Sequence, residues 1–449
     1  MVVVLGDDQP QQASLLLIRF GIVTGIDHRL RVLVSAFACA PGRGSEPRTG
    51  WETVRVLAPR HDLTVVTRSQ YRRTIEAEVA REGGPLAGVR FVYLDADGLP
   101  ETWLDSRNWG ENVVYLAWQL RVRRWVRRHV DLFDLAHHVT FVRYWVAPGV
   151  AGVPGLACVI GPVGGADSAP PALAATLSRR GRLAGRVRDG VRAFFSSWPG
   201  LRRAVSTAEV CLATSPAAVQ SLRRLGAGDV RIAPDVFARP EAVAASRTEP
   251  AATPPLVVGA GRMIEWKAYH LAVLAWARAA VPGYLALYGA GPSLERVRAL
   301  AEELGVADRV RLPGAVPRDD VLNALRQARL FVHPSLHDSG GTVIVEALQN
   351  GVPVVCWDHA GPGQMVDSSC GAAIPVDDVP ADDAIEAMAS AIRRLVTDDE
   401  AWRAAAEGAL ERVRTRLNTE AHADRLEASY RAAFARSTYD GNGSDNSWG

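Results

Sequence analysis

Lysine is almost absent from this sequence, since 50 of its 51 basic residues are arginine and the remaining one is Lys267. Against 49 acidic residues the net charge is +2, so no field of one sign covers the chain and nucleic acid is not an expected partner. Cysteine is scarce as well: the five cysteines are scattered and form no C-x-x-C pair. This distribution argues against a disulfide framework or a thiolate metal site, and it indicates free thiols in a reducing cytoplasm.

Long apolar runs are missing too. No segment reaches the roughly 18 uninterrupted apolar residues of a membrane-spanning helix. Residues 1–28 have acids where a signal peptide has its basic region, and Arg19 interrupts their apolar run LLLIRFGIV. We interpret 1–28 as a disordered extension and expect a second disordered segment in the polar tail 437–449.

Short apolar runs alternate along the chain with longer helical patterns. This alternation is typical of α/β folds, in which helices cover both faces of a parallel sheet. A Pro- and Ala-rich stretch at 236–254 lacks an apolar period and predicts an interdomain linker. We therefore predict an N-terminal domain over 29–235, a C-terminal domain over 255–420, and a final helix over 421–436 that packs toward the N-terminal domain. Strands are expected at 31–38, 62–67, 89–95, 134–139, 156–161, 209–214, 230–234, 255–261, 283–291, 309–314, 329–335, 353–358 and 371–376.

Two such domains would face each other across a cleft at the carboxyl ends of their strands, where open α/β sheets bind ligands. Gly261, Arg262 and Lys267 lie at the turn between the strand 255–261 and a helix. Two cations there can grip adjacent phosphates, and backbone N–H groups of the turn add to them. Lysine is a compact point charge on a thin stem, suited to reach one phosphate oxygen in a tight place. We predict that Lys267 is a phosphate ligand; a solvated lysine at a helix start is the alternative.

The segment HPSLHDSGGTVIVEALQ places one acid on either side of a glycine turn. Gly340 and Gly341 allow close approach of the backbone, and the helix that begins near Gly341 presents unpaired N–H groups, that of Thr342 among them, to an anion. Glu346 lies more than a turn into that helix, where its carboxylate can accept hydrogen bonds from two ribose hydroxyls. Asp338 either binds the ligand or caps the helix.

The motifs GRMIEWK, LYGAGP, RVRLPGAVPRDDV, HPSLHDSGG, VIVEAL and NGVPVVCWD follow one another in an order that resembles the C-terminal domain of the GT-B glycosyltransferases, retaining family four. The resemblance covers roughly 250–435 and implies two Rossmann-like domains that face each other across a cleft. It also implies that Arg262 and Lys267 bind the donor diphosphate and that Glu346 binds the nucleotide ribose.

The same resemblance implies that Asp338 and the backbone at Gly340 and Gly341 hold the donor sugar. It adds Gly289, Gly291 and Pro292 of LYGAGP to the donor-binding set. Two departures leave the donor sugar open: Asp338 replaces the usual glutamate, and Gly340 stands where the family often has an aromatic residue.

In the N-terminal half, ACAPGRGSEPRTGW and IGPVGG look like the bacterial branch with a GSE-containing first loop and a GPVGG loop. Gly42, Gly44 and Ser45 would let backbone approach the cleft contents. Glu46 would accept a hydrogen bond from an acceptor hydroxyl; an ordinary long loop is the alternative. Gly164 and Gly165 would contribute to an anion-binding concavity of amides.

His137 and His138 follow one another in a predicted strand, and in the family a histidine near this place contacts the donor sugar or the region of attack. Strand period alone does not decide which of them faces the cleft. We expect His138 because Thr140 is close, and we take it as a candidate catalytic residue beside Arg262, Lys267 and Asp338. A structural histidine is the alternative.

On this resemblance we predict a hexosyltransferase that moves a hexose or a derivative from a nucleoside-diphosphate sugar, best matched by a UDP-sugar, to an acceptor hydroxyl with retention of configuration. No metal or other cofactor is required, because two cations and a helix start can stabilise the leaving diphosphate. The acceptor is a small molecule, a glycan or a lipid-linked glycan. The alternatives are a catalytically weak sugar-nucleotide-binding protein or partner subunit, and a UDP-sugar 2-epimerase of the same fold.

The expected location is the cytoplasm. Two Arg-rich segments, 121–129 and 179–203, lie in the half expected to bind the acceptor. They are open to two interpretations: weak contact with the inner membrane face, or solvated helix faces.

Overall fold

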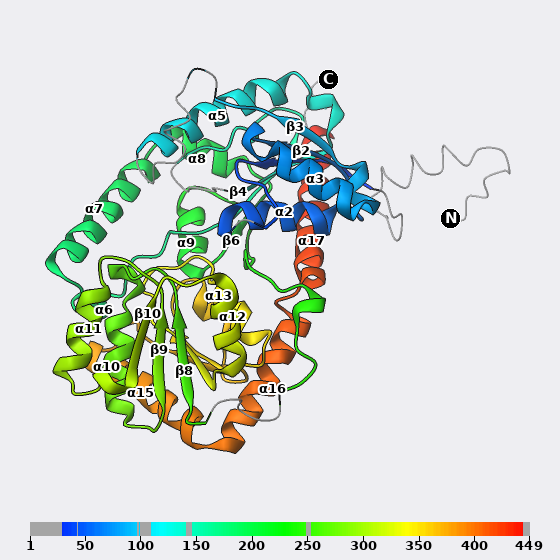
Figure 1. The fold of residues 1–449 in the computed structure, drawn as a ribbon. Helices are drawn as coiled ribbons and strands as arrows, with labels where there is room; N and C mark the ends of the chain where they lie inside the picture. The colour runs from blue at the N-terminus through cyan, green and yellow to red at the C-terminus, as the bar shows by residue number, and fades with distance from the viewer. Residues whose placement is uncertain are drawn as a thin grey trace, which may run out of the picture.

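Figure 1 shows the computed structural model, which describes residues 29–42, 44–96, 98, 109–140, 146–247 and 253–442. Two parallel sheets lie one above the other in this view, one in each half of the molecule. The first has seven strands in the order β3-β2-β1-β4-β5-β6-β7, and the second has six in the order β10-β9-β8-β11-β12-β13. The strands are β1 Arg31–Ala36, β2 Asp62–Thr67, β3 Arg90–Tyr93, β4 Leu135–Thr140, β5 Ala157–Val163, β6 Val210–Ala213, β7 Val230–Ile232, β8 Leu256–Ala260, β9 Tyr284–Tyr288, β10 Val310–Gly314, β11 Leu330–His333, β12 Val354–Trp357 and β13 Gly371–Ile374.

The strands read as continuous apolar runs because each sheet is buried on both faces. In β1 every residue after Arg31 is buried. Successive side chains of β1 enter different cores: Leu33 packs in the cluster of Trp118, and Val34 packs in the cluster of Trp51. The second sheet repeats this arrangement with its own two cores. The predicted α/β fold with two parallel-sheet domains is confirmed, and all thirteen expected strands are present.

Helices connect the strands as the apolar period predicts. No helix among the described residues is both long enough and apolar enough to span a bilayer. The first half contains α2 Ser45–Leu57, α3 Arg72–Glu82, α5 Trp109–Arg127, α6 Pro171–Ala174, α7 Arg179–Ser196, α8 Pro199–Ser206 and α9 Pro216–Arg224. The second half contains the short 3-10 helix η5 Glu265–Lys267, then α10 Tyr269–Ala279, α11 Leu294–Glu303, α12 Arg318–Gln327, α13 Thr342–Leu348, α14 Pro362–Met365, α15 Ala381–Thr397, α16 Asp399–Thr415 and α17 Thr419–Asn442.

The chain passes between the two halves twice. In the stretch expected as a linker, Ala238 pairs with Asn418 in an isolated parallel bridge just before α17 begins. Helix α17, red in Figure 1, then runs back to the first sheet, where the Tyr430 hydroxyl lies 2.7 Å from Nδ1 of His137. The helix continues to Asn442, so the first residues of the expected tail 437–449 are helical. The expected extension 1–28 and residues 443–449 lie outside the described residues.

Candidate active site

Loops at the carboxyl ends of β5, β8 and β11, together with the segment after β7, meet between the two halves; we call this region the interdomain site. A Cβ placed on Gly164, after β5, would lie only 2.2 Å from Cβ of Ser339, after β11. A Cβ placed on Gly340 would lie 2.6 Å from Oδ1 of Asp235, after β7. The glycines thus let backbone from the two domains approach to contact distance.

The glycine turns after β8 and β9 pack backbone on backbone. Gly289 has φ +137° and Gly291 has φ +152°, and a Cβ on them would lie 1.8 Å and 2.3 Å from the carbonyl oxygens of Gly261 and Met263. The Met263 amide donates to the carbonyl of Ala290 at 2.9 Å. Only glycine fits at these two positions, so the close backbone contact holds the turns GAGR and GAGP in place relative to each other. Pro292 follows Gly291 in the second of these turns.

Lys267 lies directly beside Asp338. The Leu336 amide donates to the carbonyl of Trp266 at 2.8 Å, which ties the loop after β11 to η5. As a result Nζ of Lys267 donates to Oδ2 of Asp338, and Nε2 of His333 donates to the same oxygen at 3.0 Å. The side chains of the lysine and the aspartate keep 17% and 20% of their exposure, so this pair is reachable from solvent.

The charge state of Asp338 follows from these neighbours. Burial alone raises the pKa of a carboxyl group, but the hydrogen bond from His333 and the charge of Lys267 outweigh it and hold the pKa of Asp338 well below its usual range. Burial lowers the pKa of His333, so its imidazole is neutral and donates through Nε2. The site therefore holds a fixed carboxylate whose partner cation is the only lysine of the chain.

Arg262 is exposed, and its side chain makes no hydrogen bond or ion pair with the described part of the protein. Beneath this turn the Tyr269 hydroxyl is buried, and a Cβ on Gly261 would lie 2.8 Å from it. The side chains of Arg262 and Lys267 thus project from the same turn. The Arg262 guanidinium has no partner among the described residues, whereas the Lys267 ammonium is paired with Asp338. Two cations in this state can take up a diphosphate.

The loop after Asp338 enters α13 through a strained turn. Gly341 has φ +134° at the N-cap of α13, and Thr342 is the first helical residue. The glycine turn after β12, residues 360–364, supports this loop, because the Gly361 amide donates to the carbonyl of Asp338 at 3.0 Å. The predicted helix start and the predicted glycine geometry are both present.

Glu346 is buried to 8% exposure and lies between two arginines. Its carboxylate accepts a hydrogen bond from Arg318 at the start of α12, and Nη1 of Arg48 in α2 lies 3.7 Å from the same Oε1. Arg48 belongs to the first half, so this carboxylate links the two domains. Neither arginine was expected here from the sequence, although Arg318 lies within the motif RVRLPGAVPRDDV.

The first loop is only partly placed. Gly44 is the N-cap of α2 and has no heavy atom within 4 Å of a Cβ built on it, and Glu46 is exposed in the first turn of that helix. The side chain of Ser45 lies outside the described residues. Gly165 adopts φ +77° beside Gly164, as a concave turn of amides requires.

Asp235 is a residue of this site that the sequence reasoning missed. Its Oδ1 is buried and has no hydrogen-bond partner in the described structure. Burial, and then the negative charges of Glu46 and Asp338, raise the pKa of Asp235 to about 7. The residue lies at the start of a polar stretch with no period, so no sequence pattern distinguished it from the linker that follows.

The expectation that His138 faces the interdomain site is wrong. His138 is fully buried, with Ser35 Oγ 3.1 Å from Nδ1 and the Tyr115 hydroxyl 2.8 Å from Nε2. His137 is also fully buried, held by Tyr430 and by the carbonyl of Gly161 at 2.8 Å. Burial lowers the pKa of His137 to about 4 and that of His138 to about 3, so both are neutral structural side chains.

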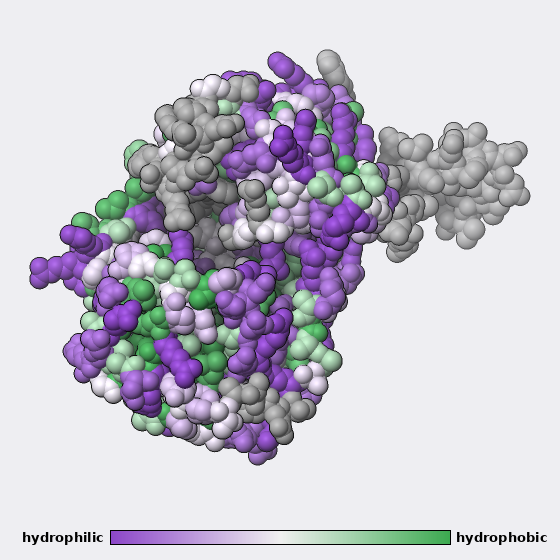
Figure 2. Space-filling model, viewed as in Figure 1, coloured by the Kyte–Doolittle hydropathy of each residue, from purple (hydrophilic) through white to green (hydrophobic). Residues whose placement is uncertain are grey.

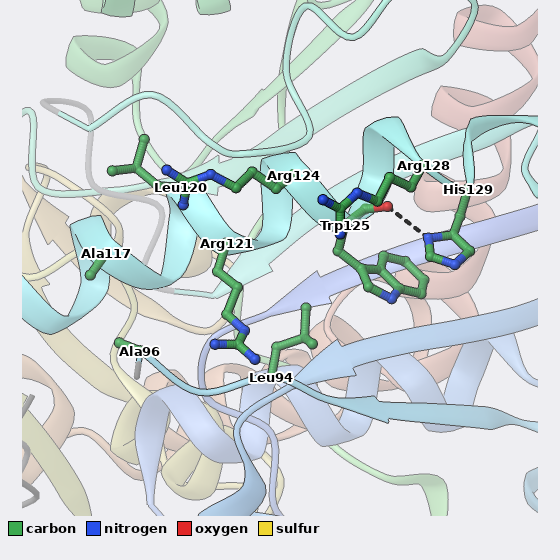
Figure 3. A pocket seen from close by; sticks show the side chains of 9 residues that line it. All are labelled: Leu94, Ala96, Ala117, Leu120, Arg121, Arg124, Trp125, Arg128 and His129. Carbon is green, nitrogen blue, oxygen red and sulfur yellow. Dashed lines mark hydrogen bonds between the residues drawn. The ribbon is translucent and has the colours of Figure 1, made fainter. Parts of the chain in front are cut away.

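A separate hollow of about 480 Å³ opens between α5 and the end of β3 (Figure 3). Leu94 and Ala96 form its floor, and Arg121, Arg124 and Trp125 lie along α5 above them. None of the residues expected to bind the donor lines it. This hollow is therefore distinct from the interdomain site.

Comparison with known proteins finds similar sequences for the second half of the chain and similar folds for nearly all of it. Residues 244–412 match the family described as glycosyl transferases group 1. The lipopolysaccharide core biosynthesis glycosyltransferase LpsE of Rhizobium meliloti is 35% identical over 160 residues, a region that spans 35% of this chain but only 44% of that relative.

Several solved structures match nearly the whole chain. Sucrose-phosphate synthase from Thermosynechococcus elongatus superposes with a TM-score of 0.60 at 20% identity, covering 91% of this chain and 100% of that one. HepE from Anabaena, in complex with UDP and glucose, superposes with a TM-score of 0.54 at 15% identity, covering 90% and 100%. The protein therefore has the two-domain GT-B fold, and its residues 244–412 are similar to the glycosyltransferase group 1 family.

Proposed function

We propose that the protein is a retaining glycosyltransferase that transfers a hexose or a derivative from a nucleoside-diphosphate sugar to an acceptor hydroxyl. The observation that carries the proposal is the pairing of Lys267 with Asp338 beside the exposed Arg262. The similarity to LpsE and to HepE, which was solved with UDP and glucose, supports the substrate class, with a UDP-sugar as the best-matched donor.

In the proposed donor pose the diphosphate binds at the turn after β8 and the ribose binds at Glu346. The diphosphate lies against Arg262, Lys267 and the amides of the glycine turns, while the start of α13 adds its unpaired N–H groups. Glu346 accepts hydrogen bonds from the ribose hydroxyls. For this, Arg318 or Arg48 must release its contact with the Glu346 carboxylate.

When the diphosphate binds, the Lys267 ammonium exchanges its contact with Asp338 for a phosphate oxygen. Asp338 stays ionised, because His333 still donates to it, and its carboxylate becomes available to the hydroxyls of the donor sugar. Binding of the phosphate and binding of the sugar are thus coupled through one ion pair.

In the reaction the glycosidic bond to the diphosphate breaks and the bond to the acceptor oxygen forms on the same face of the sugar. The acceptor proton passes to an oxygen of the departing phosphate, and Arg262 and Lys267 stabilise the charge that develops there. These two cations supply the electrostatic stabilisation that a divalent metal gives in other transferases, so we propose a reaction without added metal. Contact between the loops at Gly164 and Ser339 excludes water from the donor.

The test begins with a thermal-shift panel of UDP, GDP, dTDP and ADP in the absence of metal. A ligand at 100 times its dissociation constant adds about 2.7 kcal/mol of stability. We expect one diphosphate to stabilise the wild type and to lose most of that effect in Lys267→Ala, while the exposed control Arg298→Ala on α11 responds as the wild type does.

The matching nucleotide sugar is then incubated with mono- and disaccharide acceptors, and the anomeric configuration of the product is read by NMR. Transfer with retained configuration supports the proposal. Diphosphate binding without transfer or donor hydrolysis would instead indicate a binding protein, and a 2-epimerised donor would indicate an epimerase.

A further inference from the structure

Helix α7 is the most exposed helix that the first half carries. None of its 18 residues is buried. Four large apolar side chains on it are open to solvent: Leu183 at 62%, Val187 at 58%, Val191 at 43% and Phe194 at 64%. Trp198, just beyond its end, is 56% exposed. Figure 1 places this helix along the left edge of the molecule, and Figure 2 shows apolar and polar side chains side by side over it.

The exposed apolar residues form one stripe. Positions 183, 187, 191 and 194 are spaced by three and four residues, so they lie on a single face of the helix. The opposite face is fixed to the protein: Arg192 donates to the carbonyl of Ala166 and to Ser168, and Gly181 lies against Glu265 of the second domain. The stripe therefore points away from the body.

The polar residues of α7 are almost all cations. The helix contains six arginines and one acid, Asp189, which leaves it five positive charges in excess. Arg188 and Arg192 lie within 3.6 Å of that acid. Arg179, Arg180 and Arg186 are exposed beside the stripe and pair with no acid in the described part of the protein.

We propose that α7 docks this protein on the surface of a bilayer that contains anionic lipids. An amphipathic helix with cations flanking an apolar face lies in the plane of the interface, its apolar side chains among the acyl chains and its cations at the headgroups. A second copy of the chain fits the surface less well, because a twofold contact would bring two such cationic faces together. The proposal goes beyond the transferase activity, since it concerns a surface that contains none of the residues placed at the donor.

The experiment measures binding of the full-length protein to sonicated vesicles by co-sedimentation at low and high salt. The vesicles are either pure phosphatidylcholine or phosphatidylcholine with about 30% phosphatidylglycerol. Phosphatidylglycerol supplies the anionic headgroups that the arginines would contact. We expect binding to the anionic vesicles, weakened by salt, and at least about tenfold weaker binding to the neutral ones.

Two variants separate the contributions. The triple variant Leu183→Ser/Val187→Ser/Phe194→Ser removes three exposed apolar side chains and should weaken binding by about tenfold for each. The triple variant Arg179→Gln/Arg180→Gln/Arg186→Gln should weaken it by about fivefold for each charge. The control Leu132→Ser changes an exposed leucine outside α7, of which 45% is accessible, and should bind as the wild type does. Melting temperatures show whether each variant is folded, as expected for exposed positions.

Three results would overturn the proposal. The first is wild-type protein that stays in the supernatant with both kinds of vesicle. The second is a folded serine variant that still binds anionic vesicles with wild-type affinity. The third is a wild-type dimer in sedimentation velocity that the serine variant converts to a monomer, because the stripe would then be an interface between copies. Each readout is independent of glycosyl transfer, so failure here and failure of the proposed activity are distinguishable.

Discussion

Replacing Lys267 by methionine tests two roles of this side chain: pairing with the Asp338 carboxylate and, under our proposal, binding the donor phosphate. Methionine keeps most of the length and removes the charge. In the wild type, Nζ donates to Asp338, and the same carboxylate oxygen accepts from His333 at 3.0 Å. The lysine therefore balances a carboxylate, and under our proposal it also binds donor phosphate.

The expected loss of stability follows from burial. Removing one partner of a buried ion pair costs about 3–5 kcal/mol. Here 17% and 20% of the two side chains remain exposed and His333 stays in place, so we expect a smaller loss of about 2 kcal/mol, below that range. Because the pKa of Asp338 is lowered in the folded protein, the stabilisation from Lys267 is present above the unfolded pKa of about 3.9 and disappears as pH falls through the folded pKa. The difference between wild type and Lys267→Met, measured by urea denaturation, should therefore be full at pH 7 and shrink below pH 4.

The double variant Lys267→Met/Asp338→Asn gives the decisive comparison. Once the carboxylate is neutral, the missing ammonium no longer leaves an unpaired charge, so stability should largely return. Affinity for the diphosphate identified in the thermal-shift panel should stay low, by about 3 kcal/mol or roughly 150-fold, because the phosphate contact is still absent. Asp338→Asn alone should bind that diphosphate at least as well as the wild type, since its lysine is freed. Calorimetry measures these affinities, with Arg298→Met as the matched loss of an exposed cation. If the double variant bound the diphosphate like the wild type, Lys267 would only balance Asp338 and our account of the donor site would be refuted.

Three further outcomes are expected. The raised pKa of Asp235 means that the folded state retains a proton longer than the unfolded state, so wild-type stability should fall by up to about 1.4 kcal/mol per pH unit between pH 4 and 7. In Asp235→Asn, melting temperatures measured from pH 4.5 to 8 should not show that fall. If the slope were unchanged, a group other than Asp235 would be responsible for the pH dependence. Gly164→Ala places a Cβ 2.2 Å from the loop after β11, so it should lower kcat/KM at least about tenfold with little change in melting temperature, whereas the open position Gly185→Ala should not. Tyr430→Phe removes the 2.7 Å hydrogen bond to His137 and should cost about 1–2 kcal/mol in denaturant unfolding while activity at 25 °C is retained; equal stability would contradict the role of that bond.

The strands and the turns that follow them were predictable because they depend on local chemistry. Each strand needs a short apolar run, and each glycine turn needs a backbone conformation or a close approach that other residues resist, as at Gly289 and Gly341. For this reason the positions of Gly261, Arg262 and Lys267 between strand and helix came from the sequence.

The orientation of the two histidines in β4 was not predictable. Period two places His137 and His138 on opposite faces of the sheet, but in a parallel sheet both faces are covered. Helix α17 covers the face of His137 through Tyr430, and α5 covers the face of His138 through Tyr115. The choice between cleft and core therefore depended on helices that lie far from β4 along the chain.

By itself, the sequence determined an α/β chain with two parallel sheets, and it located the glycine turns and the lone lysine at the edge of the second sheet, because apolar periodicity and backbone freedom are properties of short segments. Only the tertiary structure brought Asp235 against Gly340, Arg48 of one domain toward Glu346 of the other, and His333 onto Asp338. These contacts join residues from different elements, and their energies depend on burial and on the charges that folding brings near. Asp235 illustrates this, since nothing in the sequence marks its carboxyl group, whereas burial between the domains and the charges of Glu46 and Asp338 raise its pKa to about 7.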